Sequence, residues 1–88
     1  MVTSMDEDER FYFRAGKLYR INKFSSNYQW TPIYKHNDGR QVIGRLDKDG
    51  LFLFTGNVWI KNMQIIYEEC IGWISIDYTT KVEEIREK

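Results

Sequence analysis

The chain has 88 residues, a formal net charge of zero and one cysteine, and aromatic residues make up 16% of it. This length suits one domain with a modest core, and a single cysteine excludes an internal disulfide. One proline and a high aromatic content argue against a disordered chain and favour a compact β-fold. No apolar run approaches the roughly 20 residues that cross a membrane. The polar, acidic start is unlike a secretory leader, so we expect a cytoplasmic protein.

The charges are unevenly distributed along the chain. Residues 1–10 carry a net charge of −3, residues 11–61 carry +6 and residues 62–88 carry −3. A basic centre could attract phosphates, although scattered charges on outward strand faces are the simpler explanation. We expect residues 1–10 to form a flexible acidic segment, because like charges oppose packing, and residues 11–88 to form one domain.

The first predicted strand covers residues 16–24, where the side chains alternate between two faces. Tyr19 and Ile21 fall on the same face and are expected to point into the core. The polar segment that follows contains Tyr28 and Trp30. We therefore expect these two large aromatic side chains to lie in an exposed loop.

Proline and glycine mark the next strand and two turns. Pro32 favours extended backbone and lacks a donor, so a second strand is expected to start there, at a sheet edge. The pair Asp38–Gly39 predicts a two-residue hairpin turn with positive φ at both positions. The sequence "DKDG" at 47–50 predicts a type I turn followed by a left-handed glycine.

Further stretches rich in apolar residues predict the remaining strands: residues 41–46, 51–56, 58–67 and 70–76. The run at 51–56 is continuously apolar over four residues, so burial on much of both faces is expected. Short strands separated by turns every 8–12 residues predict a small β-barrel of five or six antiparallel strands.

The tail, residues 79–88, changes its pattern. Thr80 and Glu83 have the spacing of a capping box, and Glu84 and Lys88 are four residues apart. These features predict a short C-terminal helix, with fraying or a strand extension as alternatives.

Parts of the chain resemble the bacterial SH3-like (SH3b) family. "QVIGRLDKDG" at residues 41–50 is similar to the family's central hairpin, and Trp59 is similar to the tryptophan of the strand that follows it. Gly72 and Trp73 open a "GWI" stretch that is similar to the closing strand. The resemblance covers roughly residues 32–80 and is strongest to small stand-alone barrels of tailed bacteriophages.

The resemblance implies an all-β fold, a strongly bent SH3-like barrel. In such a barrel Gly72 would let the closing strand bend and let another backbone or ring approach closely. Trp73 would cover one end of the barrel, and Ile74 would enter the core. It also suggests a bacteriophage accessory protein that binds a host factor, with cell-wall glycan or peptide binding as a further alternative.

No arrangement of residues favours an enzyme. Cys70 has only His36 as a potential base, and a buried thiol that acts as a small hydrophobe is the simpler explanation. Asp47 and Asp49 could act as an acid–base pair, but carboxylates in an exposed turn are usually solvated. The turn lacks the further oxygen ligands of a calcium loop. We therefore predict a non-catalytic protein with no metal and no cofactor.

Binding of another protein is the favoured function, because small barrels place aromatic side chains on one surface to bind extended chains. An exposed tryptophan or tyrosine is a typical interface anchor. Tyr67 and Tyr78 are weaker candidates, because about half of the aromatic residues must fill the core. The predicted protein-binding residues are Tyr28, Trp30, Tyr34, Trp59 and Trp73.

The main alternative is single-stranded nucleic-acid binding, in which aromatic rings stack on bases and cations contact phosphates. Zero net charge argues against nonspecific nucleic-acid binding as the main role. The candidate phosphate-contacting residues are Lys35, Arg40, Arg45, Lys48 and Lys61.

Overall fold

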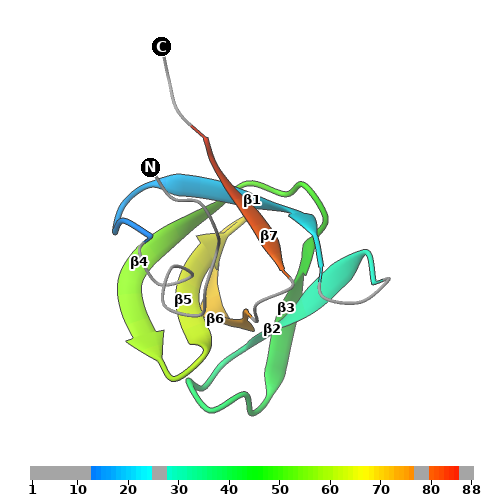
Figure 1. Cartoon of the computed structure of the whole chain (residues 1–88). Helices are drawn as coiled ribbons and strands as arrows, with labels where there is room; N and C mark the ends of the chain where they lie inside the picture. Colours follow the sequence, from blue (N-terminus) through cyan, green and yellow to red (C-terminus); the bar gives the residue numbers. More distant parts are fainter. Residues whose placement is uncertain (1–12, 25–27, 77–79, 86–88) are drawn as a thin grey trace.

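The structure is a computed structural model and describes residues 13–24, 28–76 and 80–85. Within these ranges it contains seven strands and no helix (Figure 1). The strands are β1 (Leu18–Lys23), β2 (Trp30–Tyr34), β3 (Val42–Asp47), β4 (Phe52–Trp59), β5 (Asn62–Tyr67), β6 (Cys70–Ser75) and β7 (Lys81–Ile85). The predicted all-β class is confirmed, whereas the expected five or six strands are too few. The predicted flexible segment 1–10 and Tyr78 lie outside the described residues.

The seven strands form one antiparallel sheet in the order β3-β2-β6-β5-β4-β1-β7. The sheet curls into a half-barrel (Figure 1), and among the described residues no ladder joins β3 to β7. Backbone hydrogen bonds from the β3–β4 turn nevertheless connect parts of the sheet that no ladder joins. In the β3–β4 turn, the backbone N–H of Lys48 donates to the carbonyl of Gln29 (2.8 Å), and that of Asp49 donates to the carbonyl of Ile21 (2.9 Å). This turn therefore holds β1 next to the β2–β3 hairpin.

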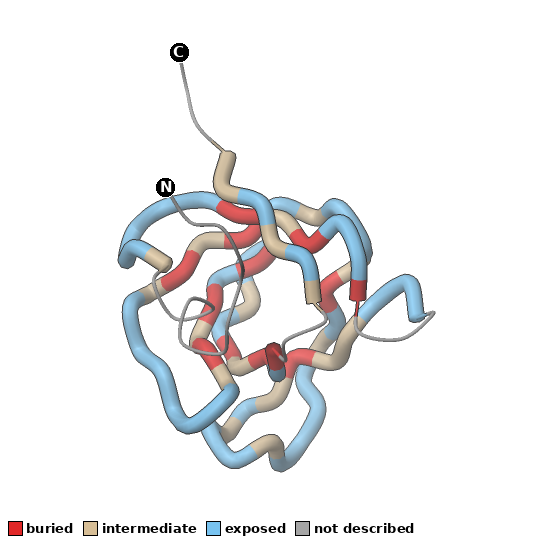
Figure 2. The backbone as a smooth tube through the Cα atoms, in the orientation of Figure 1, coloured by how far each residue is buried: buried red, intermediate tan, exposed pale blue. Residues whose placement is uncertain are grey.

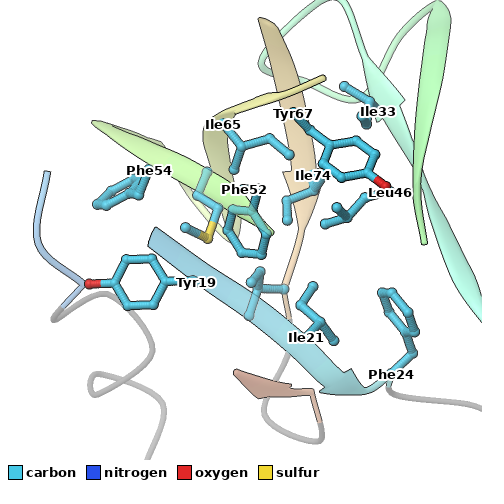
Figure 3. Packing of buried hydrophobic residues seen from close by; sticks show 12 residues of the cluster. Tyr19, Ile21, Phe24, Ile33, Leu46, Phe52, Phe54, Ile65, Tyr67 and Ile74 are labelled. Carbon is cyan, nitrogen blue, oxygen red and sulfur yellow. The ribbon is translucent and has the colours of Figure 1, made fainter. Parts of the chain in front are cut away.

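The core lies inside the curl. Figure 2 shows buried segments along the inner side of the sheet and exposed segments in the hairpin turns. Tyr19 and Ile21, which were predicted to face inward, are 2% and 0% exposed, so that prediction is confirmed. The core of the described chain consists of Tyr19, Ile21, Phe24, Ile33, Leu46, Phe52, Phe54, Met63, Ile65, Tyr67, Ile74 and Ile76 (Figure 3).

The predicted C-terminal helix is wrong, because the tail forms strand β7. Leu18 of β1 lies opposite Ile85 of β7, and Arg20 lies opposite Glu83 with a 3.0 Å ion pair between them. Val82 packs against the core. A short helix is marginal without tertiary contacts, whereas β1 offers a free edge that satisfies backbone groups along the whole of β7. Pairing with a distant strand therefore overrides the local capping pattern.

The predicted turn at residues 36–40 forms with a different geometry. The backbone N–H of Gly39 donates to the carbonyl of His36 at 3.1 Å, which places Asn37 and Asp38 in the middle of the turn. Between residues 36 and 40, only Gly39 has a positive φ, at 84°. The two-residue turn predicted for Asp38–Gly39 is therefore wrong, although the hairpin reverses at the expected place.

In the turn at 47–50, Asp49 takes the positive φ (66°), where the sequence predicted Gly50. A β-carbon on Gly50 would lie 2.8 Å from the ring and the hydroxyl oxygen of Tyr67. Glycine at position 50 is therefore required by close packing and not by a left-handed backbone. Aspartate tolerates the left-handed region better than most residues, which explains the exchange of roles.

Strand β2 lies between β3 and β6, so the prediction of an edge strand is wrong for the strand as a whole. However, β2 pairs with β6 only at Tyr34, which lies opposite Trp73. On the side away from β3, the sheet is therefore open next to Pro32. The missing donor of proline costs no ladder hydrogen bond there.

Candidate functional site

The three tryptophans of the chain all lie outside its core. Trp30 and Trp59 are 41% and 48% exposed, and Trp73 is half-buried. The twelve core positions of the described chain are filled instead by isoleucine, leucine, methionine, phenylalanine and tyrosine. Large side chains that are left outside a core so small are candidates for contacts with a partner.

Trp73 lies on the outer face of β6. Its two neighbours, Gly72 and Ile74, are buried, and side chains alternate between the faces of a strand. The prediction that Ile74 enters the core is confirmed, whereas Trp73 does not plug the end of a barrel. Trp73 lies directly opposite Tyr34 of β2 on one side and Gln64 of β5 on the other.

Strand β2 presents a second indole on the same outer face. Trp30 and Tyr34 lie four residues apart on β2, on the face opposite to that of the buried Ile33. The guanidinium carbon of Arg45 lies 5.5 Å from the centroid of the Trp30 ring, within cation–π range. Arg45 is in turn bound to Asp47 at 3.1 Å. We call Trp30, Tyr34 and Trp73 the aromatic strip.

Neutral hydrogen-bonding groups flank the aromatic strip on β4 and β5. The hydroxyl of Thr55 and the side-chain amide of Asn57 both donate to Oε1 of Gln64, at 2.8 and 2.7 Å. These bonds fix Gln64 beside Trp73. The amide of Asn62 donates to the backbone carbonyl of Asn37 at 2.7 Å and so ties the β4–β5 hairpin to the β2–β3 turn. The strip therefore borders a row of ordered, uncharged polar groups.

Two further predicted protein-binding residues, Trp59 and Tyr28, are not part of the strip as defined above. Trp59 ends β4 opposite Asn62, and β4 and β6 are separated by β5. Two strand spacings, about 10 Å, therefore separate Trp59 from the β6 strand that carries Trp73. Tyr28 is 67% exposed and precedes β2. Tyr67, the weaker candidate, belongs to the core.

The predicted phosphate-contacting residues are dispersed. Lys35 and Arg40 lie in the β2–β3 connection, Arg45 on β3, Lys48 in the β3–β4 turn and Lys61 in the β4–β5 turn. Three of them form exposed ion pairs: Arg40 with Asp38 (2.8 Å), Arg45 with Asp47 (3.1 Å) and Lys48 with Asp49 (3.3 Å). Such pairs add little stability, about 0–1 kcal/mol, but each neutralises its cation locally.

The thiol of Cys70 is half-buried and packs against the core. A β-carbon on Gly44 would lie 3.3 Å from its Sγ, so the thiol faces the backbone of β3. Among the described residues, no group of three or more histidine, cysteine, aspartate or glutamate side chains could hold a metal ion. No helix in these ranges has the length and hydropathy to span a membrane.

The structure also shows an outer apolar surface that the sequence did not predict. Leu18 lies opposite Leu53, Leu53 opposite Ile66, and Ile66 opposite Ile71, so four neighbouring strands carry an aliphatic residue at matched positions. Ile85 of β7 continues the row beside Leu18. Leu18, Ile66 and Ile71 are 41%, 37% and 57% exposed. We call these five residues the aliphatic row.

The aliphatic row was missed because burial on both faces was expected for residues 51–56. Phe52 and Phe54 do fill the core, but Leu53 is only half-buried and Leu51 is 50% exposed. An apolar run looks the same in sequence whether one face or both are covered. Only the register between strands reveals that exposed aliphatic residues align.

Comparison with known proteins adds no relative, because no family model, curated protein or solved structure matches the chain.

Proposed function

We propose that this protein is a non-catalytic interaction module that binds another protein through the aromatic strip. The observation that carries the proposal is that all three tryptophans lie outside a core that is complete without them. Burying such side chains at an interface stabilises a complex, and tryptophan and tyrosine are enriched among residues that dominate binding energy.

The surroundings of the strip fit a protein partner. The centres of protein interfaces are rich in aromatic residues and arginine and poor in other charges. Here Arg45 packs over Trp30, and the neutral amide of Gln64 lies beside Trp73. The strip could therefore bury its rings while its polar neighbours hydrogen-bond to the partner.

Single-stranded nucleic acid is the second candidate, because the same rings could stack on bases. The positions and ion pairs of the basic residues give less support to nucleic-acid binding. Arg40, Arg45 and Lys48 are each paired with an aspartate, and the five predicted cations are spread over β3 and three connections. A protein partner is therefore the better supported of the two.

The bacterial SH3-like resemblance adds further predictions to this proposal: a bacteriophage origin, a host factor as the partner, and the cytoplasm as the compartment. Cell-wall glycan or peptide binding is the remaining alternative from the same source. These predictions depend on the sequence motifs alone.

Affinity capture from a bacterial lysate tests the proposal. The double variant Trp30→Ala/Tyr34→Ala should lose a partner that the unaltered protein retains, at similar thermal stability. Val58→Ala is a matched control, because Val58 is as exposed as Trp30 (41%) but lies on β4 outside the strip.

Capture of the same protein by Trp30→Ala/Tyr34→Ala at equal yield would exclude the strip as the binding site. Loss of the captured material between about 50 and 200 mM salt, together with a gel shift of single-stranded DNA, would favour the nucleic-acid alternative. Co-sedimentation with purified cell wall would favour the glycan alternative.

A further inference from the structure

We infer that the aliphatic row forms a second docking surface, and that it binds a protein segment whose aliphatic side chains are followed by lysine or arginine. This surface does not depend on the aromatic strip for its argument. It lies on the outer faces of β1, β4, β5, β6 and β7, whereas most of the strip lies on β2.

The apolar side of the surface is continuous. Leu53, Ile66 and Ile71 lie at opposed positions on three neighbouring strands, which span about 10 Å. Leu51, which directly precedes β4, widens the surface, and the buried Phe52 separates it from Leu53. Contiguous exposed apolar area of this kind marks interaction sites on soluble proteins.

The fold does not require aliphatic residues at these positions. The next outward position on β4 after Leu53 is Thr55, and the next one on β5 beside Ile66 is Gln64. Both are polar, and they hydrogen-bond to each other. A solvent-facing sheet normally alternates apolar inward positions with polar outward ones. Ile71 is 57% exposed and therefore gains little from the core.

The charge beside the row indicates the kind of segment that fits. Glu68 and Glu69 form the β5–β6 turn, one residue pair (Tyr67–Cys70) beyond the opposed pair Ile66–Ile71. Both are exposed, and neither forms an ion pair with another described residue. Two unneutralised carboxylates at one end of an apolar surface complement a partner with cations next to its apolar side chains.

At the opposite part of the surface, the described residues next to the row include a neutralised ion pair. Arg20 of β1 and Glu83 of β7, next along the outer face from Leu18 and Ile85, neutralise each other at 3.0 Å. Among the described residues that flank the row, the unpaired negative charge of Glu68 and Glu69 lies at the β5–β6 end. A bound segment should place its lysine or arginine residues at that end and its aliphatic residues over Leu53, Ile66 and Ile71.

Nuclear magnetic resonance titration tests the inference with two amphipathic probe peptides of equal length, one of leucine and lysine, the other of leucine and glutamate. We expect the leucine–lysine peptide to shift the amides of Leu53, Ile66 and Ile71 and those next to them. The leucine–glutamate peptide should bind at least roughly tenfold more weakly, because it lacks cations for the turn.

Four variants separate the contributions of the aliphatic row, the charged turn and the aromatic strip. Ile66→Ser/Ile71→Ser should weaken binding by roughly tenfold or more, and Val58→Ser, the same kind of substitution at an exposed residue outside the row, should leave it unchanged. Glu68→Gln/Glu69→Gln should weaken binding by roughly fivefold at low salt, a difference that disappears at about 0.5 M salt. Trp30→Ala/Tyr34→Ala should bind the peptide normally, so this inference and the proposed function can fail separately.

Several results would overturn the inference. Equal affinity for the two peptides, shifts confined to other strands, or no shifts at millimolar peptide would each do so. Concentration-dependent shifts of the row without peptide would assign it to a second copy of the chain. Binding to phosphatidylcholine vesicles that is lost in Ile66→Ser/Ile71→Ser would assign it to a lipid surface.

Discussion

The carbonyl oxygen of Tyr34 lies 2.6 Å from the position that a β-carbon on Gly72 would occupy, and Ile33 is also in contact with that position. Gly72 is buried on β6, where β6 meets β2 at the single pair Tyr34–Trp73. The absence of a side chain at Gly72 therefore allows the two strands to approach. The close approach of another backbone, expected for Gly72 from the sequence, is confirmed.

Substitution of Gly72 should therefore be costly. Gly72→Ala is expected to lower the free energy of unfolding by roughly 2–4 kcal/mol, because a backbone carbonyl must move to admit the methyl group. Urea denaturation measures the change. Gly44→Ala is the control, since its β-carbon would meet the thiol sulfur of Cys70 at 3.3 Å, and that side chain can adjust. Equal decreases in the free energy of unfolding for the two variants would contradict the packing described at Gly72.

The β5–β6 turn carries backbone strain that can be removed. Glu68 and Glu69 have φ values of 50° and 69°, and they connect the opposed residues Tyr67 and Cys70. A two-residue turn with both φ values positive favours Asn-Gly, and two adjacent carboxylates also repel each other.

Glu68→Asn/Glu69→Gly should therefore raise the free energy of unfolding by about 1–2 kcal/mol, measured by urea denaturation. Glu68→Gln/Glu69→Gln is the matched control, because it removes the charges and keeps both β-carbons in the left-handed region. If the Gln–Gln variant gained as much stability as the Asn–Gly variant, repulsion and not backbone conformation would be responsible.

Tyr67 makes stability depend on pH in the alkaline range. Burial raises the pKa of its phenol, and the negative charges of Glu68 and Asp47 raise this pKa further. The folded state therefore keeps the phenol neutral, while in the unfolded chain it ionises near pH 10. Its contribution to stability is complete below about pH 10 and is lost as the pH rises through the folded-state pKa.

Denaturation between about pH 8 and pH 11.5 tests this dependence. Stability should fall above pH 10, and the fall should be smaller in Tyr67→Phe, which lacks the titrating group. Glu68→Gln should lower the pKa of Tyr67 toward its ordinary value. Identical pH profiles for Tyr67→Phe and the unaltered protein would show that other groups cause the fall.

Local pattern predicted much of the fold. The inward positions of Tyr19 and Ile21 and the strand at 42–47 follow from alternation and from turn residues near them in sequence, and the burial of Ile74 follows from the SH3-like resemblance. The strand at the tail did not follow, because β7 depends on a partner, β1, about 60 residues earlier in the chain. The capping box and the i,i+4 pair involve only residues close together in the sequence, so they favoured a helix over pairing with a distant strand.

The candidate site could be predicted only in part, for a similar reason. The sequence indicated which aromatic residues could bind a partner, but strand register decides which of them meet. It places Tyr34 opposite Trp73 and separates Trp59 from them. The aliphatic row depends on register across five strands, and no single stretch of sequence contains it.

The most direct test of the central claim compares alanine substitutions at tryptophans and at a core residue by urea denaturation. Trp30→Ala and Trp59→Ala should each cost less than about 1.5 kcal/mol, because both indoles are more than 40% exposed. Phe52→Ala, at a fully buried position, should cost about 3–5 kcal/mol. If either tryptophan variant lost as much stability as Phe52→Ala, that indole would be part of the structure and not free to bind a partner.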